Sequence, residues 1–241
     1  MTYYIRHLFC VAAALSSVAV QAIELNSNFN LDLTPTLVSD YRSMGVSQTQ
    51  GNPALQLSGV LTHSSGLFLG LWASNVDFGT KARLEEGYYA GYSHAFTEAI
   101  NISASIGRYE YPGEASLDTN EIYAEANIHQ LKIGYIYDYG VANHVPDLSS
   151  RFIGYTFNLP YDTNLYIKYG HTDYGFDMYS GNGSTRQTYS DWEVKLSKAF
   201  YGVTFSADFI DTDMSKHECM SVMAVDDVCS ATLVIAATKT F

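Results

Sequence analysis

The chain has 241 residues, a formal net charge of −12 and only 16% charged residues, yet it contains 20 Tyr and 12 Phe. Disordered chains have few aromatic and many charged residues, so this composition excludes disorder. A soluble domain carries about 25% charged residues, and a nucleic-acid-binding chain concentrates Lys and Arg, so both classes are disfavoured. Since Tyr joins an apolar ring to a polar hydroxyl, the composition favours a surface in contact with both hydrocarbon and water.

The first 22 residues have the three parts of a secretory signal. A short start carries Arg6, the apolar run 8–20 follows, and Val20-Gln21-Ala22 provides small residues for cleavage. We predict Sec-type export and cleavage after Ala22, which leaves 23–241 with a net charge of −13 because Arg6 is lost. No later run is long and apolar enough for a transmembrane helix, so a membrane location requires a closed sheet.

Two cysteines remain after the predicted cleavage, Cys219 and Cys229. Export takes them to an oxidising compartment, where we expect them to form a disulfide. Closing a loop of about ten residues stabilises a protein by roughly 2–4 kcal/mol. A zinc site that includes His217 is the alternative, but the spacing is not that of a zinc site.

Apolar and polar residues alternate along most of the mature chain, which is the period of a β-strand. In 100–107, for example, Ile, Ile, Ala and Ile alternate with Asn, Ser, Ser and Gly. A soluble β-sandwich alternates in the same way, so a single strand does not decide between the two classes. The predicted strands, in chain order, are 36–46, 53–62, 66–75, 86–95, 99–109, 120–128, 131–139, 151–159, 164–173, 188–198, 201–211 and 231–241.

Short and long connections alternate between these strands. An outer-membrane barrel is built this way, with short periplasmic turns and long external loops, whereas a sandwich has no reason to place its long loops at every second connection. We therefore predict an all-β fold, a transmembrane antiparallel β-barrel of about 12 strands formed by 23–241 in the cell outer membrane. The long connections are 47–52, 76–85, 110–119, 140–150, 174–187 and 212–230.

The chain ends in Phe241, on an alternating strand. Barrel proteins of the bacterial outer membrane commonly end in an aromatic residue on such a strand. We interpret Phe241 as an assembly signal, which makes the barrel-assembly machinery an expected partner.

Several sequence blocks resemble one family. The blocks Val38-Ser39-Asp40-Tyr41-Arg42, Gly45-Val46-Ser47-Gln48-Thr49 and Trp72-Ala73-Ser74-Asn75-Val76-Asp77-Phe78 are similar to the TorF porin family, which consists of Gcw_chp-type proteobacterial outer-membrane proteins. The resemblance covers nearly all of the mature chain. Met44 departs from it, because the family often has a second Arg there. The resemblance implies an outer-membrane barrel that resembles channels in outline, and it says nothing about the cargo.

In a channel, the inward side chains determine which solutes pass. Their acidic excess favours cations, and twelve strands imply a narrow or partly blocked lumen. We predict a porin for passive passage of small solutes or ions with a mild cation preference. A structural or surface-interaction barrel with a plugged lumen and no transport is the alternative. The lumen-lining candidates are Asp40, Arg42, Glu121, Glu125, Lys132, Asp138, Lys168, Asp191, Glu193, Lys195 and Asp208.

Aromatic residues at outward positions suit an interfacial girdle, which contacts outer-membrane lipid and lipopolysaccharide. Stacking against sugars is the alternative role for such residues. The girdle candidates are Tyr135, Tyr137, Tyr139, Tyr155, Tyr169 and Trp192.

No pattern points to catalysis or to a cofactor. His63-Ser64 lies in a predicted turn, and no G-x-S-x-G motif or matching base accompanies it. The acidic loop 212–230 lacks the spacing of a calcium loop, so a solvated loop is preferred to a divalent-cation site. We therefore expect no enzyme activity, no cofactor, no metal and no nucleic-acid partner.

Overall fold

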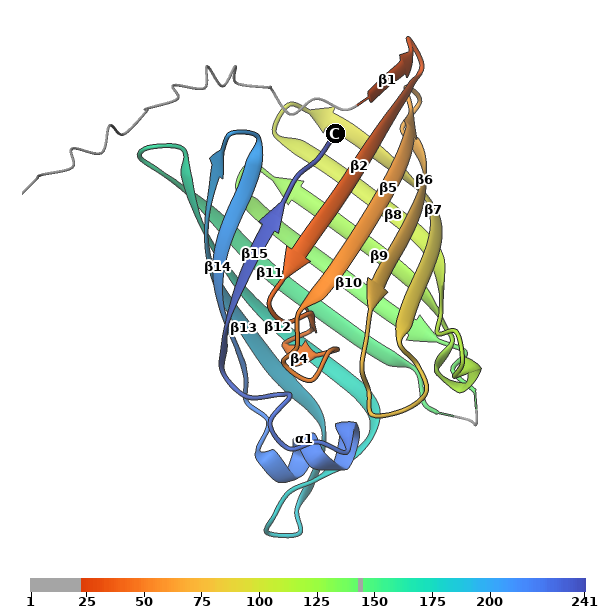
Figure 1. Cartoon of the computed structure of the whole chain (residues 1–241), viewed down its shortest axis with the longest axis vertical. Helices are drawn as coiled ribbons and strands as arrows, with labels where there is room; N and C mark the ends of the chain where they lie inside the picture. Colours follow the sequence, from red (N-terminus) through yellow and green to blue (C-terminus); the bar gives the residue numbers. More distant parts are fainter. Residues whose placement is uncertain (1–22, 143–144) are drawn as a thin grey trace, which may run out of the picture.

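The computed structural model describes residues 23–142 and 145–241, and the predicted signal segment 1–22 lies outside the described residues. Strands make up most of the described chain (Figure 1). The elements in chain order are β1 (Ile23–Asn26), β2 (Phe29–Val38), β3 (Arg42–Ser43), β4 (Val46–Ser47), β5 (Ala54–His63), β6 (Leu67–Asn75), β7 (Leu84–Thr97), β8 (Ile100–Glu110), the 3₁₀ turn η1 (Ala115–Leu117), β9 (Thr119–Ile128), β10 (Leu131–Tyr139), β11 (Leu148–Leu159), β12 (Thr163–Tyr179), β13 (Thr185–Phe200), β14 (Val203–Thr212), α1 (Lys216–Met223) and β15 (Thr232–Thr238).

Twelve of these strands close into one antiparallel barrel. The strands from β5 to β15 follow one another around the ring, and β2 closes it by pairing with β15 on one side and β5 on the other. β1 pairs with β2 and extends the sheet beyond the ring. The predicted all-β barrel of about twelve strands is therefore confirmed.

Alternating side chains give the wall an apolar outer face and a mixed inner face. On β6, Leu67, Leu69 and Leu71 are exposed to the outside, whereas Phe68 and Trp72 alternate with them on the inner face. A continuous row of exposed leucines suits hydrocarbon surroundings better than water. Within the described residues, no helix has the length and apolar character needed to cross a membrane.

Glycines on the inner face make room for aromatic rings from the next strand. A Cβ atom at Gly70 would lie 2.0 Å from the Tyr89 ring, and one at Gly154 would lie 2.2 Å from the Tyr166 hydroxyl. Only glycine allows such an approach. The rings therefore lie over the wall rather than across the lumen, which preserves space in a narrow barrel.

The two ends of the barrel differ in their connections. Turns of two or three residues, such as 129–130, join strands at the short-turn end, while longer segments such as 76–83 and 213–231 lie at the long-loop end. Figure 1 shows the C-terminus near the short-turn end and α1 at the long-loop end.

The predicted first strand, 36–46, is wrong. The strand in the wall is β2, which ends at Val38, and the chain then leaves the wall. Alternation is present from Phe29 onward, but Pro35 cannot donate a ladder hydrogen bond and argues against a central strand in the sequence. Pro35 lies at the seam next to the C-terminus, where its carbonyl still accepts a hydrogen bond from the Lys239 amide, 3.1 Å away.

The strands that exceed their predicted lengths most are β12 and β13. β12 and β13 extend past the predicted limits 164–173 and 188–198, so their connecting loop is only 180–184. The extension of β12 is stable as a strand because one of its added residues, Met178, is buried against other segments at the long-loop end. The predicted loop 212–230 also contains the helix α1, which local alternation does not reveal.

Candidate functional site

The segment 39–53 folds into the barrel and forms the small β3–β4 hairpin. Asp40 holds it together: its carboxylate accepts hydrogen bonds from the hydroxyls of Ser47 and Thr49, and Arg42 Nε lies 2.7 Å from its Oδ2. Gly45 occupies the tip with φ +84°, and a Cβ there would lie 2.6 Å from Thr212 Cγ2. The hairpin therefore lies directly against the wall.

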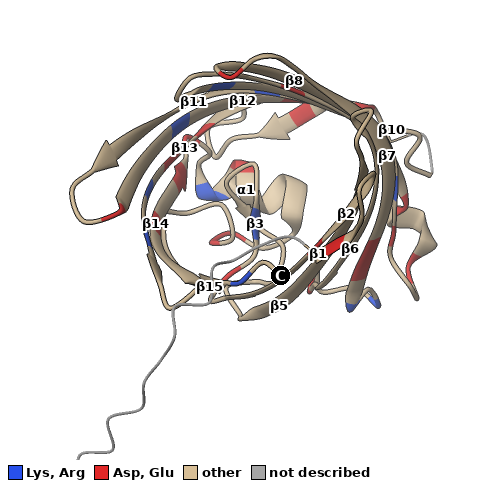
Figure 2. Cartoon of the chain, turned by 90° about the horizontal axis from the view of Figure 1, so that it is seen from above, with Lys and Arg blue, Asp and Glu red and all other residues tan. Residues whose placement is uncertain are grey.

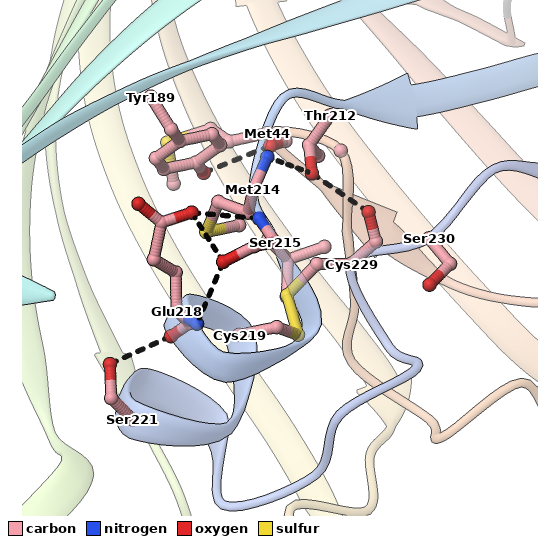
Figure 3. The surroundings of a disulfide bond; sticks show 12 residues. Met44, Tyr189, Thr212, Met214, Ser215, Glu218, Cys219, Ser221, Cys229 and Ser230 are labelled. Carbon is pink, nitrogen blue, oxygen red and sulfur yellow. Dashed lines mark hydrogen bonds between the residues drawn. A yellow bond between two sulfur atoms is a disulfide. The ribbon is translucent and has the colours of Figure 1, made fainter. Parts of the chain in front are cut away.

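The segment 213–231 carries α1 and a disulfide between Cys219 and Cys229, so the predicted disulfide is confirmed (Figure 3). Ser215 and Glu218 form a capping box at the start of the helix: the Ser215 hydroxyl accepts from the Glu218 amide, and the Glu218 carboxylate accepts from the Ser215 amide. Reciprocal capping satisfies two amides that would otherwise lack partners. This fixes a helix of only eight residues.

These two segments contact each other and form what we call the plug, residues 39–53 and 213–231. The Ser47 amide donates to the Val228 carbonyl at 2.8 Å, and Arg42 Nη1 donates to the Ser230 carbonyl at 2.8 Å. Viewed along the barrel in Figure 2, α1 and β3 lie inside the outline of the ring. The plug therefore narrows the barrel at its long-loop end. The plug shares an apolar core with strands β12 and β13, which consists of Val46, Cys219, Val228 and Cys229 from the plug and Met178 and Tyr189 from the strands.

An ion pair ties the plug to β13. Arg186 donates from Nε and Nη2 to both Glu218 oxygens, at 2.7 and 3.0 Å, and also pairs with Asp213. Burial by itself raises the pKa of Glu218, but hydrogen bonds from Arg186 and Ser215 outweigh it and hold the pKa below its ordinary value. Glu218 is therefore ionised at neutral pH and holds the plug against the wall.

The lumen contains a cavity of about 830 Å³ next to the plug. Both the plug, through Tyr41, Arg42 and Gln48, and the barrel wall contribute to its lining. Polar and aromatic side chains are mixed there, as in sites that accept small solutes.

One side of this cavity carries three carboxylates, Glu85, Glu121 and Asp138, which we call the acidic wall. Glu121 lies directly opposite Asp138 in the pairing of β9 with β10. The Tyr109 hydroxyl donates to Glu121 Oε1 at 3.3 Å. Within the described part of the chain, no Lys or Arg nitrogen lies within 4.0 Å of these carboxylates. The acidic wall is therefore rich in uncompensated charge.

The other side carries an alternating series of ion pairs on β12, β13 and β14, which we call the ladder. Lys168 Nζ lies 2.9 Å from Asp191 Oδ2 and 3.5 Å from Glu193 Oε2, and Lys195 Nζ lies 2.6 Å from Glu193 Oε1 and 3.1 Å from Asp208 Oδ2. Buried charges are tolerated when they are paired in this way. Every charge of the ladder therefore has a partner of opposite sign, and removing one partner would leave a buried charge uncompensated.

The structure places the predicted lumen residues in three groups. Asp40 and Arg42 lie inside the barrel but on the plug, so their predicted position on a wall strand is wrong. Four wall residues line the large cavity, and the remaining wall residues form ion pairs on the inner face. The cavity-lining residues are Glu121, Asp138, Lys195 and Asp208, and the others are Glu125 with Lys132, and Lys168 with Asp191 and Glu193.

The predicted girdle residues lie on outward positions of the wall. Tyr135, Tyr155 and Tyr169 are exposed, the rings of Tyr137 and Tyr139 stack with their centroids 5.7 Å apart, and Trp192 pairs with Tyr169 across strands. Phe241 ends the chain at the short-turn end, where its amide donates to the Leu33 carbonyl at 2.9 Å. The short-turn end also has exposed aromatics that we did not predict: Phe96, Tyr161, Phe200 and Tyr201.

Sequence reasoning missed Glu85 and the aromatic residues around it. The predicted strand begins at 86, two residues after the observed start at Leu84, so the prediction places Glu85 in a loop. The pair Glu85-Glu86 did carry a signal, because alternation extended backward from Tyr88 places Glu86 outside and Glu85 inside. Trp72 lies on the strand that pairs with β7, so the hairpin places it near Glu85, whereas nothing local indicates that Tyr41 lies there.

A family model described as "Bacterial protein of unknown function (Gcw_chp)" matches residues 22–241. No curated protein matches the chain in sequence.

Porins are among the solved structures of similar shape. The NanC porin has a TM-score of 0.54 and 9% identity, over 87% of this chain and 97% of that chain. The KdgM porin has a TM-score of 0.51 and 10% identity, over 88% of this chain and 98% of that chain. The KdgM porin in complex with disordered oligogalacturonate has a TM-score of 0.50 and 11% identity, with the same coverage. At such identities the similarity shows a shared barrel fold.

Proposed function

We propose that this chain, which belongs to the Gcw_chp family of bacterial proteins of unknown function, is an outer-membrane channel for passive passage of small solutes or ions. The proposal includes Sec-type export, cleavage after Ala22, assembly from the Phe241 signal and the narrower TorF assignment. It also includes contact of the outward aromatics with lipid and lipopolysaccharide, and no enzymatic activity.

The observation that carries the proposal is the cavity of about 830 Å³ inside a closed barrel with an apolar outer face. An apolar exterior suits hydrocarbon, and a closed sheet leaves no backbone group unpaired there. A polar interior then provides a route for solutes. The shared barrel fold of the NanC and KdgM porins supports the same conclusion.

We propose a preference for cations. The predicted lumen residues contain more carboxylates than basic groups, and the acidic wall adds Glu85. Carboxylates along a narrow path attract cations and repel anions. The oligogalacturonate in the KdgM complex is itself acidic, so an acidic lumen predicts a different cargo for this chain.

The plug supports a second candidate, a structural barrel without transport. It buries residues from both of its segments, including Val46 and Cys219, and covers the long-loop end. In this case the folded wild-type protein conducts nothing until the plug is loosened.

Planar bilayers distinguish the two candidates. For heat-modifiable, folded protein we expect discrete conductance steps and, in a KCl gradient, a reversal potential of the sign that indicates cation preference. Silence of the folded protein, with conductance only after reduction of the disulfide, would support the structural barrel. Conductance steps without ion selectivity would contradict the proposed cation preference but would still support a channel.

Proteolysis of intact cells tests location and orientation. Lys81 and Lys216 lie in connections at the long-loop end. With that end outside, we expect added trypsin to cleave there and to leave the short turns intact. Cleavage next to 129–130 instead would reverse the orientation, and recovery of the protein in the soluble periplasm would exclude an outer-membrane location.

A further inference from the structure

The acidic wall concentrates charge in a confined space. Glu85 is only 6% exposed, and it lines the same cavity as Glu121 and Asp138. Carboxylates that share such a space without a cation repel one another and lose hydration. A bound cation relieves both costs, so the acidic wall attracts a positively charged ligand.

Aromatic rings lie beside these carboxylates. The Tyr41 hydroxyl and the Trp72 indole are turned toward Glu85, and the two rings meet edge to face with centroids 6.0 Å apart. Aromatic faces attract cations, most strongly organic ones whose alkyl groups also gain from contact with the ring. Burial, followed by the carboxylates of Glu85 and Asp138, raises the pKa of the nearby Tyr111 hydroxyl.

A second, independent feature lies on the opposite side of the same cavity. Asp208 is only 4% exposed, and its Oδ2 pairs with Lys195. Its Oδ1 is buried and has no hydrogen-bond partner among the described residues. A buried carboxylate oxygen is rarely left without a donor. Since Lys195 already compensates the charge of Asp208, this oxygen offers an acceptor to an N–H group of an occupant, and the acidic wall supplies the unpaired charge.

We propose that the acidic wall is a binding site for a small organic cation with an ammonium group, held by the carboxylates and the rings of Trp72 and Tyr41. In the described chain no group of three His, Cys, Asp or Glu side chains is arranged to hold a metal ion, and the cavity is far larger than a bare ion. The site rests on the channel function proposed above and adds the class of its cargo.

Tryptophan fluorescence measures this binding directly. The chain has two Trp residues, so a Trp192→Phe background leaves Trp72 as the reporter. Folded protein in detergent at pH 8, where carboxylates are ionised, is titrated with tetramethylammonium chloride and, at equal ionic strength, with sodium chloride. We expect a saturable change with tetramethylammonium and none with sodium.

Neighbouring residues on β7 provide a matched control. Glu85→Gln should weaken binding roughly tenfold, the effect of losing one charged contact. Glu86→Gln removes the same charge one residue away, on the outer face, and should leave binding unchanged. Asp138→Asn is the second test variant, and heat-modifiability shows that each variant is folded. Equal responses to both salts, or equal weakening by Glu85→Gln and Glu86→Gln, would overturn the proposal.

Bilayer recordings separate this inference from the channel itself. If tetramethylammonium reduces the potassium conductance and Glu85→Gln relieves the block, both proposals stand. If tetramethylammonium does not change the conductance, the channel function is supported and the proposed binding site is contradicted. Saturable fluorescence from a protein that never conducts removes the channel and retains the binding site.

Discussion

The two charged sides of the lumen contrast sharply. The ladder on β12, β13 and β14 pairs almost every charge, and Asp191 in it is 1% exposed. The acidic wall on β7, β9 and β10 has comparable burial at Glu85 but no basic partner within reach in the described chain. A paired buried charge stabilises packing, whereas an unpaired one facing a cavity remains available to a ligand. We therefore expect substitutions in the ladder to change the stability of the protein and substitutions in the acidic wall to change its ion selectivity.

The largest expected effect comes from breaking the ladder. Lys168→Met leaves Asp191 buried without its cation and should lower the free energy of unfolding by roughly 3–5 kcal/mol. Glu85→Gln removes an uncompensated charge and should leave that free energy unchanged or higher. Urea unfolding in lipid vesicles measures both. Lys132→Met is the control, because its pair with Glu125 is more exposed and should cost under about 1 kcal/mol. Similar losses for Lys168→Met and Glu85→Gln would erase the contrast.

Removing the disulfide tests whether the plug limits the flow of ions through the lumen. Replacing Cys219 and Cys229 by Ser should destabilise the plug by roughly 2–4 kcal/mol. We expect single-channel conductance to rise, with cation preference retained because the acidic wall is unchanged. Reduction of the wild-type protein should reproduce the result. A rise in conductance with complete loss of selectivity would assign selectivity to the plug instead.

Ion selectivity should depend on the acidic wall and not on the ladder. Glu121→Gln removes a carboxylate from the acidic wall, so the reversal potential in a KCl gradient should move toward zero. The double variant Lys168→Met with Asp191→Asn removes one charge of each sign from the ladder and should leave the reversal potential near its wild-type value. If the double variant shifts the potential more than Glu121→Gln does, the assignment of roles is reversed.

The smallest expected effect concerns the ion pair of Arg186 and Glu218, which is partly exposed and lies outside both the ladder and the acidic wall. Because the pKa of folded Glu218 is lowered from 4.5, its stabilisation is present above pH 4.5 and is lost as the pH falls through the lower folded value. Its size is about 1 kcal/mol, since a third of the Arg186 side chain is exposed. Hydrogen exchange of 213–231 should show this loss in the wild type, and Glu218→Gln, compared at each pH, should not show it.

Most strands of the barrel can be predicted from local sequence patterns. Alternation between adjacent residues identified eleven of the barrel strands approximately, as the agreement of 131–139 with β10 illustrates. The alternation of short and long connections indicated a closed barrel, and the spacing of Cys219 and Cys229 indicated their disulfide. These features depend on neighbours in the sequence, so the sequence contains them directly.

The sequence by itself determined the barrel, its apolar outer face and its short supply of charge at the surface. The tertiary structure alone decided that 39–53 turns inward and that it meets 213–231, because the direction of a loop depends on what it packs against. It also decided which charges are paired. Lys168 and Asp191 lie on neighbouring strands, as do Trp72 and Glu85, whereas Tyr41 is brought beside them only when the plug enters the barrel. Local alternation shows which face a side chain occupies, but only closure of the barrel determines what lies beside it there.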